Sequence, residues 1–384
     1  MTFERVQRAL AEIKAGRMII LVDDEDRENE GDLCMAAEYV TAAAINFMAK
    51  QARGLICMTM DAELVSRLEL PLMVSENGSP YGTAFTVSIE AARGVTTGIS
   101  AADRATTIKA AAAPGAKPAD LVRPGHVFPL RARDGGVLVR TGQTEGSVDL
   151  AKLAGLTKAA VICEIMNDDG SMARMSDLEV FAKTHNMPFL SIAELIQYRL
   201  AHDSLVRRLI TRDVEHPSWG KLTLHVYGTT LDNRQHMALV WGTLSADSSP
   251  LVRVHSGYPF ASVFGNLFSD DRAALSAALE TLAKDPCAVL VCIDRETPEI
   301  TLEERVRNLG EPVQEQLHTA PGMMREIGIG AQILRDLGLA HIRLLSRTGK
   351  RPVGVDGFGL VVDDVVTFDT VGKTTRPVLE VVRG

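Results

Sequence analysis

The sequence predicts an α/β (α+β) fold with two mixed α/β domains in tandem. Short apolar runs of strand length alternate with segments whose apolar residues recur at the helical period. The 384 residues fit two domains or one large one. A second series of elements begins after a charged join near residues 201–212. We therefore expect one domain at 1–205 and another at 206–384.

The expected elements follow one another closely along the chain. In the first half, helices are expected at residues 3–13, 41–51, 61–68, 102–113, 149–154, 175–185 and 191–200. Strands are expected there at residues 18–22, 54–59, 84–89, 127–131, 137–140 and 160–166. In the second half, we expect strands at 222–227, 237–242, 251–254, 288–293 and 342–345, and helices at 270–284 and 329–337.

The composition is that of a soluble globular protein, with 46% hydrophobic and 23% charged residues. The formal net charge of -8 argues against general nucleic-acid binding, although a few local arginines suffice for a phosphorylated substrate. The five cysteines form no CxxC pair, which disfavours a disulfide framework and favours a reducing cytoplasm. The sequence has no signal-peptide pattern and no stretch of about 20 apolar residues, so we expect no membrane association.

An acidic run, Asp23 to Asp32, begins where the apolar strand at 18–22 ends. Loops at strand ends are favoured ligand sites because a rigid sheet holds them, but composition alone is equally compatible with a solvated loop. Arg27 stands among the carboxylates, an arrangement that suits an anionic substrate beside an oxygen-liganded metal. A calcium EF-hand is excluded because Asn29 and Met35 occupy the positions that require Gly and Glu.

Three further segments carry candidate chemistry. The segment Arg140-Thr141-Gly142-Gln143-Thr144-Glu145-Gly146 offers a guanidinium, backbone N–H groups and hydroxyls, as a phosphate cradle does, or forms an ordinary glycine turn. His126 follows a Pro-Gly turn, where it is either a general acid or base or a structural residue. Glu164 stands in an apolar strand, where burial raises the pKa of a carboxyl group, unless it faces outward with a lateral partner.

Together these segments resemble 3,4-dihydroxy-2-butanone 4-phosphate synthase over roughly residues 1–200. The most specific pieces, at 23–33, 100–108 and 123–130, read DDEDRENEGDL, SAADRATTI and RPGHVFPL. The resemblance implies a riboflavin-pathway lyase that converts ribulose 5-phosphate into 3,4-dihydroxy-2-butanone 4-phosphate and formate. It also implies a divalent metal, Mg²⁺ or Mn²⁺, and a homodimer with active sites at the subunit interface.

The resemblance further implies roles for individual residues. Glu28 would ligate the metal, and the other carboxylates of the acidic run before it would set the local field or shape the loop. His126 and Glu164 would be the essential proton-transfer groups. The substrate would be bound by Arg27, Glu28, Asp32, Thr107, Arg140, Thr141, Gly142, Gln143 and Thr144.

One position departs from the family pattern. The second metal ligand, in the family's Arg-x-Gly-His-Thr-Glu motif, is His, and Gln143 stands there. Magnesium prefers oxygen ligands and a Gln amide offers one, so we expect Gln143 to ligate the metal, either directly or through a water, and activity to survive with an altered metal preference. A metal bridging the carbonyl and hydroxyl oxygens of the substrate stabilises the enediolate that proton removal creates.

From about residue 209 the chain resembles GTP cyclohydrolase II, on segments that include LVRVHS at 251–256 and GIGAQILRDLG at 328–338. Where that family has its catalytic Asp, this chain has Met323. The three zinc-binding cysteines are replaced by Tyr258, Ser269 and Asp271. We therefore expect no zinc and a non-catalytic domain that stabilises or regulates the synthase. The alternatives are nucleotide or partner binding without hydrolysis, and a bifunctional enzyme that also hydrolyses GTP.

Overall fold

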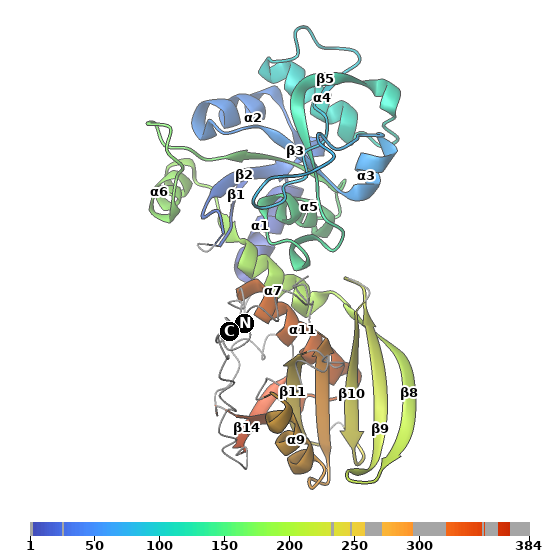
Figure 1. Ribbon diagram of the computed structural model, residues 1–384. Coiled ribbons are helices and arrows are strands. Elements are labelled where there is room, and N and C mark those ends of the chain that lie inside the picture. The colour runs from blue at the N-terminus through green and yellow to red at the C-terminus, as the bar shows by residue number, and fades with distance from the viewer. Residues whose placement is uncertain are drawn as a thin grey trace, which may run out of the picture. The chain divides into compact units, whose positions relative to one another are not determined.

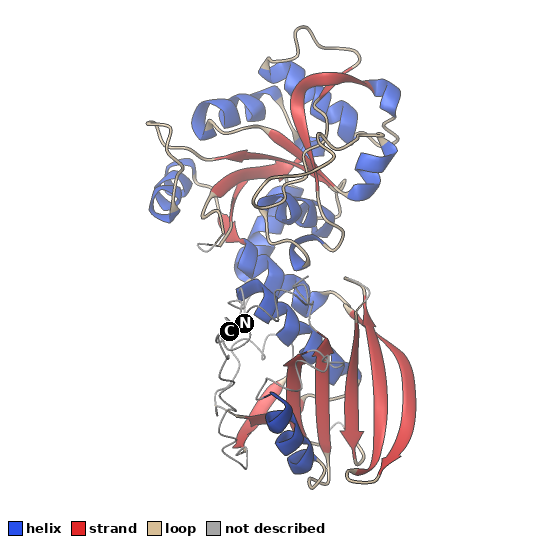
Figure 2. Ribbon diagram, viewed as in Figure 1, coloured by secondary structure: helices blue, strands red, loops and turns tan. Residues whose placement is uncertain are grey.

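Figure 1 shows the computed structural model, which describes residues 3–24, 27–231, 234–245, 248–257, 271–294, 320–347, 349 and 360–368. The chain divides near residue 200 into two compact units, called here the N-terminal and C-terminal units. Each unit combines one mixed sheet with helices (Figure 2), so the predicted fold class of two mixed α/β domains is confirmed. No helix within these residues has the length and apolar character needed to cross a bilayer.

The N-terminal unit is built on a seven-stranded sheet in the order β4-β5-β3-β6-β2-β1-β7. Its strands are β1 (Ile19–Val22), β2 (Gly31–Ala36), β3 (Cys57–Met60), β4 (Ile89–Ala91), β5 (Leu121–Arg131), β6 (Ala159–Glu164) and β7 (Phe189–Ser191). The antiparallel β1–β2 pair places Val22 opposite Gly31, so the acidic run connects two buried strands. The strand expected at 84–89 appears only as β4, and the sequence pattern did not indicate β2.

Helices cover both faces of this sheet (Figure 1). They are α1 (Glu4–Lys14), α2 (Ala42–Phe47), α3 (Ala62–Arg67), α4 (Ala101–Ala112), α5 (Gln143–Leu153), α6 (Met175–His185) and α7 (Ile192–His202). α1 and α5 pack on one face, and α2 and α4 on the other. Ile20 and Val22 join the core beside α2 and α4, whereas Ile19 and Leu21 are equally buried on the opposite face. Burial on both faces explains why β1 reads as one continuous apolar run.

The strand expected at 137–140 is absent. A 3₁₀ turn at Gly136–Leu138 takes its place, and α5 begins at Gln143, earlier than the helix that the sequence pattern predicted. The Val137 N–H donates to the Asp149 carboxylate at 2.8 Å. This segment therefore bonds to the side of α5 and not to a neighbouring strand, which is why its apolar residues are not a β-strand.

The C-terminal unit is built on a second seven-stranded sheet, in the order β14-β13-β11-β12-β10-β9-β8. β8 and β14 were not predicted, and β8 is an edge strand without a buried residue, so it has no apolar pattern. Tyr258 and Ser269 lie outside the described residues, while Asp271 begins α9 and Met323 lies in α11. The elements are β8 (Val206–His216), β9 (Gly220–Thr229), β10 (Gln235–Trp241), β11 (Leu251–Gly257), α9 (Asp271–Leu282), β12 (Ala288–Asp294), α11 (Ala320–Asp336), β13 (His341–Ser346) and β14 (Val361–Thr367).

Candidate active site

The acidic run folds around Asp23, whose side chain is fully buried. One carboxylate oxygen accepts the backbone N–H of Glu30 at 2.8 Å. The other accepts the backbone N–H of Glu28 at 3.2 Å and Nη1 of Arg27 at 2.6 Å. Residues 25–26 lie outside the described residues. Asp23 thus shapes the loop and fixes where Arg27 and Glu28 point.

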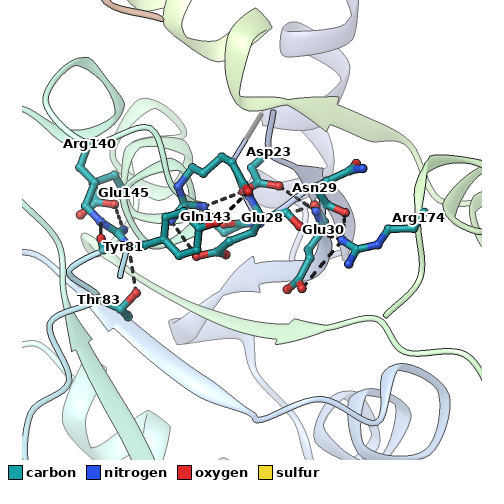
Figure 3. Close-up of polar contacts among 11 residues, drawn as sticks. Asp23, Glu28, Asn29, Glu30, Tyr81, Thr83, Arg140, Gln143, Glu145 and Arg174 are labelled. Carbon is teal, nitrogen blue, oxygen red and sulfur yellow. Dashed lines mark hydrogen bonds and ion pairs between the residues drawn. The ribbon is translucent and has the colours of Figure 1, made fainter. Parts of the chain in front are cut away.

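The Arg27 guanidinium joins two elements that are far apart in the sequence. Its Nη1 donates to Oε1 of Gln143 at 2.9 Å, and its Nη2 donates to Oε1 of Glu28 at 3.0 Å. The Tyr81 ring lies against this guanidinium, with 5.0 Å between the ring centroid and Cζ, and its hydroxyl donates to the Arg27 carbonyl oxygen. Figure 3 shows Glu28 and Gln143 meeting beside Asp23. The connection between β1 and β2 and the start of α5 therefore point two oxygens at one positive charge.

Two side-chain oxygens that converge on one cation are a donor pair that fits a hard divalent ion. Mg²⁺ keeps several water ligands and is commonly held by only one or two protein oxygens. Glu28 and Gln143 supply such oxygens from a carboxylate and an amide. In the part of the chain that the structure describes, no group of three or more His, Cys, Asp or Glu side chains is placed to hold a metal ion.

The Arg140 guanidinium lies beside Gly142 at the start of α5, where its Nη1 also donates to Oε2 of the buried Glu145 at 2.6 Å. A Cβ atom on Gly142 would lie 2.6 Å from Nη1 of Arg140 and 3.0 Å from Nη2 of Arg27, so two guanidiniums approach one stretch of backbone. A helix N-terminus adds unpaired N–H groups and a partial positive charge, which favour an anion. The motif expected as a tight loop is therefore a helix start, where Thr141 is half-buried and Thr144 is buried.

Three residues that the sequence did not single out complete the site, namely Tyr81, Thr83 and Arg174 (Figure 3). The Tyr81 carbonyl oxygen accepts Nε of Arg140 at 3.0 Å, and the Thr83 hydroxyl accepts Nη2 at 2.9 Å. Arg174 donates to the backbone carbonyl of Glu28 at 2.7 Å and so ties α6 to the acidic run. All three residues lie in loops, outside the helices and strands, so no periodic sequence pattern pointed to them.

The buried carboxyl group of Asp32 lies opposite the half-buried Glu164 in the β2–β6 register. Burial, followed by the charge of Glu164, raises the pKa of Asp32 well above its ordinary value. Burial also raises the pKa of Glu164, although the backbone N–H of Leu55, which donates to Oε2 at 2.8 Å, opposes the rise. The direction at Glu164 is the one expected for a carboxyl group in an apolar strand. Such a pair can hold and exchange a proton.

His126 belongs to a second cluster, built by β4, β5 and α4. Its Nδ1 lies 2.7 Å from Oε2 of Glu90, and its side chain is 44% exposed. Thr107, which the resemblance placed facing the site, is fully buried, and its hydroxyl donates to Oε1 of Glu90 at 2.6 Å. Sequence reasoning missed Glu90, and the only signal was an acidic residue directly after the apolar segment 84–89.

Sequence comparisons extend over the whole chain. A family model described as 3,4-dihydroxy-2-butanone 4-phosphate synthase matches residues 7–198, and one described as GTP cyclohydrolase II matches residues 207–367. The 3,4-dihydroxy-2-butanone 4-phosphate synthase of Neisseria meningitidis serogroup B is 48% identical over 370 residues, covering 96% of this chain and 98% of the relative. The riboflavin biosynthesis protein RibBA of Aquifex aeolicus is 49% identical over 371 residues, covering 94% of this chain and 91% of the relative.

Solved structures include similar chains. RibBX, a two-domain 3,4-dihydroxy-2-butanone 4-phosphate synthase from A. baumannii, is 41% identical with a TM-score of 0.77, covering 94% of this chain and 98% of that chain. A 3,4-dihydroxy-2-butanone 4-phosphate synthase in complex with two magnesium ions is 41% identical with a TM-score of 0.49, covering 50% of this chain and 95% of that chain.

Proposed function

The chain belongs to the 3,4-dihydroxy-2-butanone 4-phosphate synthase family, and we propose that it converts D-ribulose 5-phosphate to L-3,4-dihydroxy-2-butanone 4-phosphate and formate. This lyase reaction belongs to riboflavin biosynthesis. The observation that carries the proposal is the convergence of Glu28 and Gln143 on one cationic point beside the arginine-lined start of α5. A sugar phosphate requires both features, oxygens that hold a metal near its carbonyl and positive charge for its phosphate.

The phosphate group is proposed to bind at the start of α5. Arg140 offers a forked guanidinium, and Gly142 leaves its backbone open because it has no Cβ atom. The hydroxyls of Thr141 and Thr144 lie on the same turn and can donate to phosphate oxygens. Arg27 supports this binding with a second guanidinium, and Asp32 is proposed to contact the sugar hydroxyls.

Glu28 and Gln143 are proposed to hold Mg²⁺ or Mn²⁺. When bound, the ion supplies charge stabilisation to the enediolate that forms after proton removal. The chain itself orients the two ligands, because Asp23 accepts the backbone N–H of Glu28 at 3.2 Å and α5 carries Gln143. Arg27 bonds to both ligand oxygens in this structure, so its side chain must shift when they bind an ion.

Proton transfer is proposed for Glu164 and His126. The raised pKa of Glu164 lies closer to neutral pH than that of an ordinary carboxyl group, and such a group can both accept and return a proton. Asp32, which lies opposite Glu164, is buried, and a negative charge on either carboxyl group disfavours a second one on the other. The two groups therefore tend to hold one proton between them. His126 offers an exposed imidazole held by Glu90.

A homodimer is proposed to bring His126 to the acidic run of the partner subunit. Within one chain, β5 is separated from β2 by β3 and β6, which is about 14 Å across the sheet at the usual strand spacing. His126 contacts Glu90 of β4, which is itself bonded to Thr107 of α4, whereas Glu28 contacts Arg27 within the β1–β2 connection. A second copy supplies the missing half in this proposal.

For the C-terminal unit we propose a non-catalytic role and no zinc, with residues 1–205 carrying the synthase. The competing candidate is a bifunctional enzyme, which the match of residues 207–367 to the GTP cyclohydrolase II model favours. Against it stand the residues at the family's zinc positions, Tyr258, Ser269 and Asp271, which offer no thiolate. We place the protein in the cytoplasm, which suits its five free cysteines.

The test is conversion of ribulose 5-phosphate by the purified full-length protein, followed by NMR of product and formate, with Mg²⁺, Mn²⁺ or EDTA. We expect metal-dependent formation of both compounds. Glu164→Gln should lower kcat by about 100-fold or more, because it removes a proton-transfer group. Glu38→Gln is the matched control, since the Glu38 carboxylate also accepts a backbone N–H, from Thr157, but lies outside the proposed site. Absence of formate with both metals contradicts the proposal.

A further inference from the structure

Glu90 is a buried carboxylate whose two oxygens are both occupied. Its Oε2 lies 2.7 Å from Nδ1 of His126 and 3.3 Å from the backbone nitrogen of the same residue. Its Oε1 lies 2.6 Å from the hydroxyl of Thr107. Only 7% of Glu90 is exposed, so water contributes little to these contacts.

The directions of these hydrogen bonds are determined by their neighbours. The Thr107 hydroxyl already accepts the backbone N–H of Ala91 at 3.0 Å, so its own hydrogen points to Glu90. The backbone nitrogen of His126 can only donate. Oε1 of Glu90 therefore accepts from Thr107 and Oε2 accepts the backbone N–H of His126, an arrangement that favours an N–H donor at the Nδ1 position facing Oε2.

A turn at Gly98 holds this arrangement in place. A Cβ atom on Gly98 would lie 1.8 Å from Oε2 of Glu90 and 2.5 Å from Nδ1 of His126, so the backbone packs directly against the pair. The Asp103 carboxylate holds this turn, because it accepts the backbone N–H of Gly98 at 3.0 Å and the hydroxyl of Thr96 at 2.7 Å. The Gly98 backbone therefore closes one side of the Glu90–His126 pair.

We infer that Glu90 is a positioning residue that holds His126 in the Nδ1–H tautomer and leaves Nε2 as the proton acceptor. The inference rests on the proposed role of His126 in proton transfer. A neutral imidazole carries one hydrogen, so fixing it on Nδ1 leaves a lone pair on Nε2. When Nε2 takes a proton from a substrate carbon, that carbon's bonding electron pair passes to the adjacent carbonyl as an enediolate. The resulting imidazolium lies against the Glu90 carboxylate, which stabilises its charge.

The direct test is ¹⁵N NMR of the full-length protein labelled on histidine, without substrate, at about pH 8.5, where an ordinary histidine is neutral. His126→Gln identifies the His126 signals. We expect the Nδ1–H pattern in the wild type and a shift to the Nε2–H pattern in Glu90→Ala. Glu38→Ala, which removes a carboxylate that also accepts a backbone N–H, should leave the His126 signals unchanged.

The kinetic arm of the test separates positioning from binding. Glu90→Ala should lower kcat by about 10²-fold or more, with KM changed by less than about threefold. An Nε2–H pattern in the wild type, or an unchanged Nδ1–H pattern in Glu90→Ala, overturns the inference, and the wild-type spectrum does so even when the variant fails to fold. A protein that shows the expected tautomers but releases no formate contradicts the proposed function instead.

Discussion

The Arg27 guanidinium donates to the side-chain oxygen of Gln143 across 2.9 Å, and the same guanidinium holds Glu28 at 3.0 Å. The two proposed metal ligands are therefore bridged by a positive charge that belongs to the chain. A metal ion and Arg27 compete for the same two oxygens. Because of this competition, we expect a substitution at Gln143, where the family pattern has His, to change the affinity for the metal.

Gln143→His should tighten Mn²⁺ binding by about tenfold, because imidazole is a stronger donor than an amide oxygen for a first-row transition metal. Free Mn²⁺ can be followed by its EPR signal during a titration of the full-length protein. Gln7→His, on the exposed face of α1, is the matched control and should leave the affinity unchanged. Equal affinities of Gln143→His and the wild type would show that Gln143 is not a metal ligand.

Gly142→Ala should raise KM for ribulose 5-phosphate by about tenfold or more and leave the melting temperature nearly unchanged. The added methyl group would lie 2.6 Å from Nη1 of Arg140 and 3.0 Å from Nη2 of Arg27, so both guanidiniums must move while the fold can stay. Steady-state kinetics and a thermal melt measure the two effects. Gly78→Ala, with no heavy atom within 4 Å of the new methyl group, should alter neither quantity. An unchanged KM in Gly142→Ala speaks against phosphate binding at the start of α5.

Asp32→Asn should raise the melting temperature by about 2–4 °C at pH 8, and the gain should shrink toward pH 4.5. Burial raises the pKa of Asp32 above the ordinary 3.8, and that of Glu164 above the ordinary 4.5. The stability these groups contribute is complete below the unfolded-state pKa values and is lost as pH rises through the folded-state values. Asn removes the charge that would otherwise be buried. Thermal melts in EDTA over this pH range give the answer, and a variant that is less stable than the wild type at pH 8 contradicts the buried-charge account.

Arg199→Leu should destabilise the N-terminal unit by about 3–5 kcal/mol, because it leaves a buried charge without its partner. Arg199 Nη1 donates to the Asp149 carboxylate at 2.8 Å, and both side chains are only 6% exposed. Differential scanning calorimetry of the full-length protein measures the loss. The surface pair of Arg17 and Glu12 provides the control, since Arg17→Leu should lower the melting temperature far less than Arg199→Leu does. Similar losses in both variants would mean that burial of the pair contributes nothing.

Much of the N-terminal fold could be predicted because its signals are local. The strand at 18–22 is an apolar run, and Thr41 caps α2 by accepting the backbone N–H of Ala44. Ser100 caps α4 in the same way, with the N–H of Asp103. By contrast, β8 has no buried residue and thus no apolar pattern to detect. The start of α5 was missed because its N-cap is Gly142, which provides no side-chain cap of the kind that marks α2 and α4.

Within the candidate site, residues in local sequence patterns were likewise predictable, and residues defined by long-range contacts were not. The acidic run and the arginine–glycine segment are dense local patterns, so Glu28, Arg140 and their neighbours were identified from sequence. Glu90 and Arg174 act through contacts 36 and 146 residues away in the chain, and neither stands in a recognisable pattern. Their roles follow only from which side chains the fold brings to them.

Formate release from two substrates by one full-length preparation tests the central claim most directly. The protein is incubated with ribulose 5-phosphate and Mg²⁺ in one sample and with GTP in the other, and formate is measured in both by NMR. The account predicts formate from ribulose 5-phosphate, matched one to one by 3,4-dihydroxy-2-butanone 4-phosphate, and none from GTP. Formate from GTP alone would contradict it.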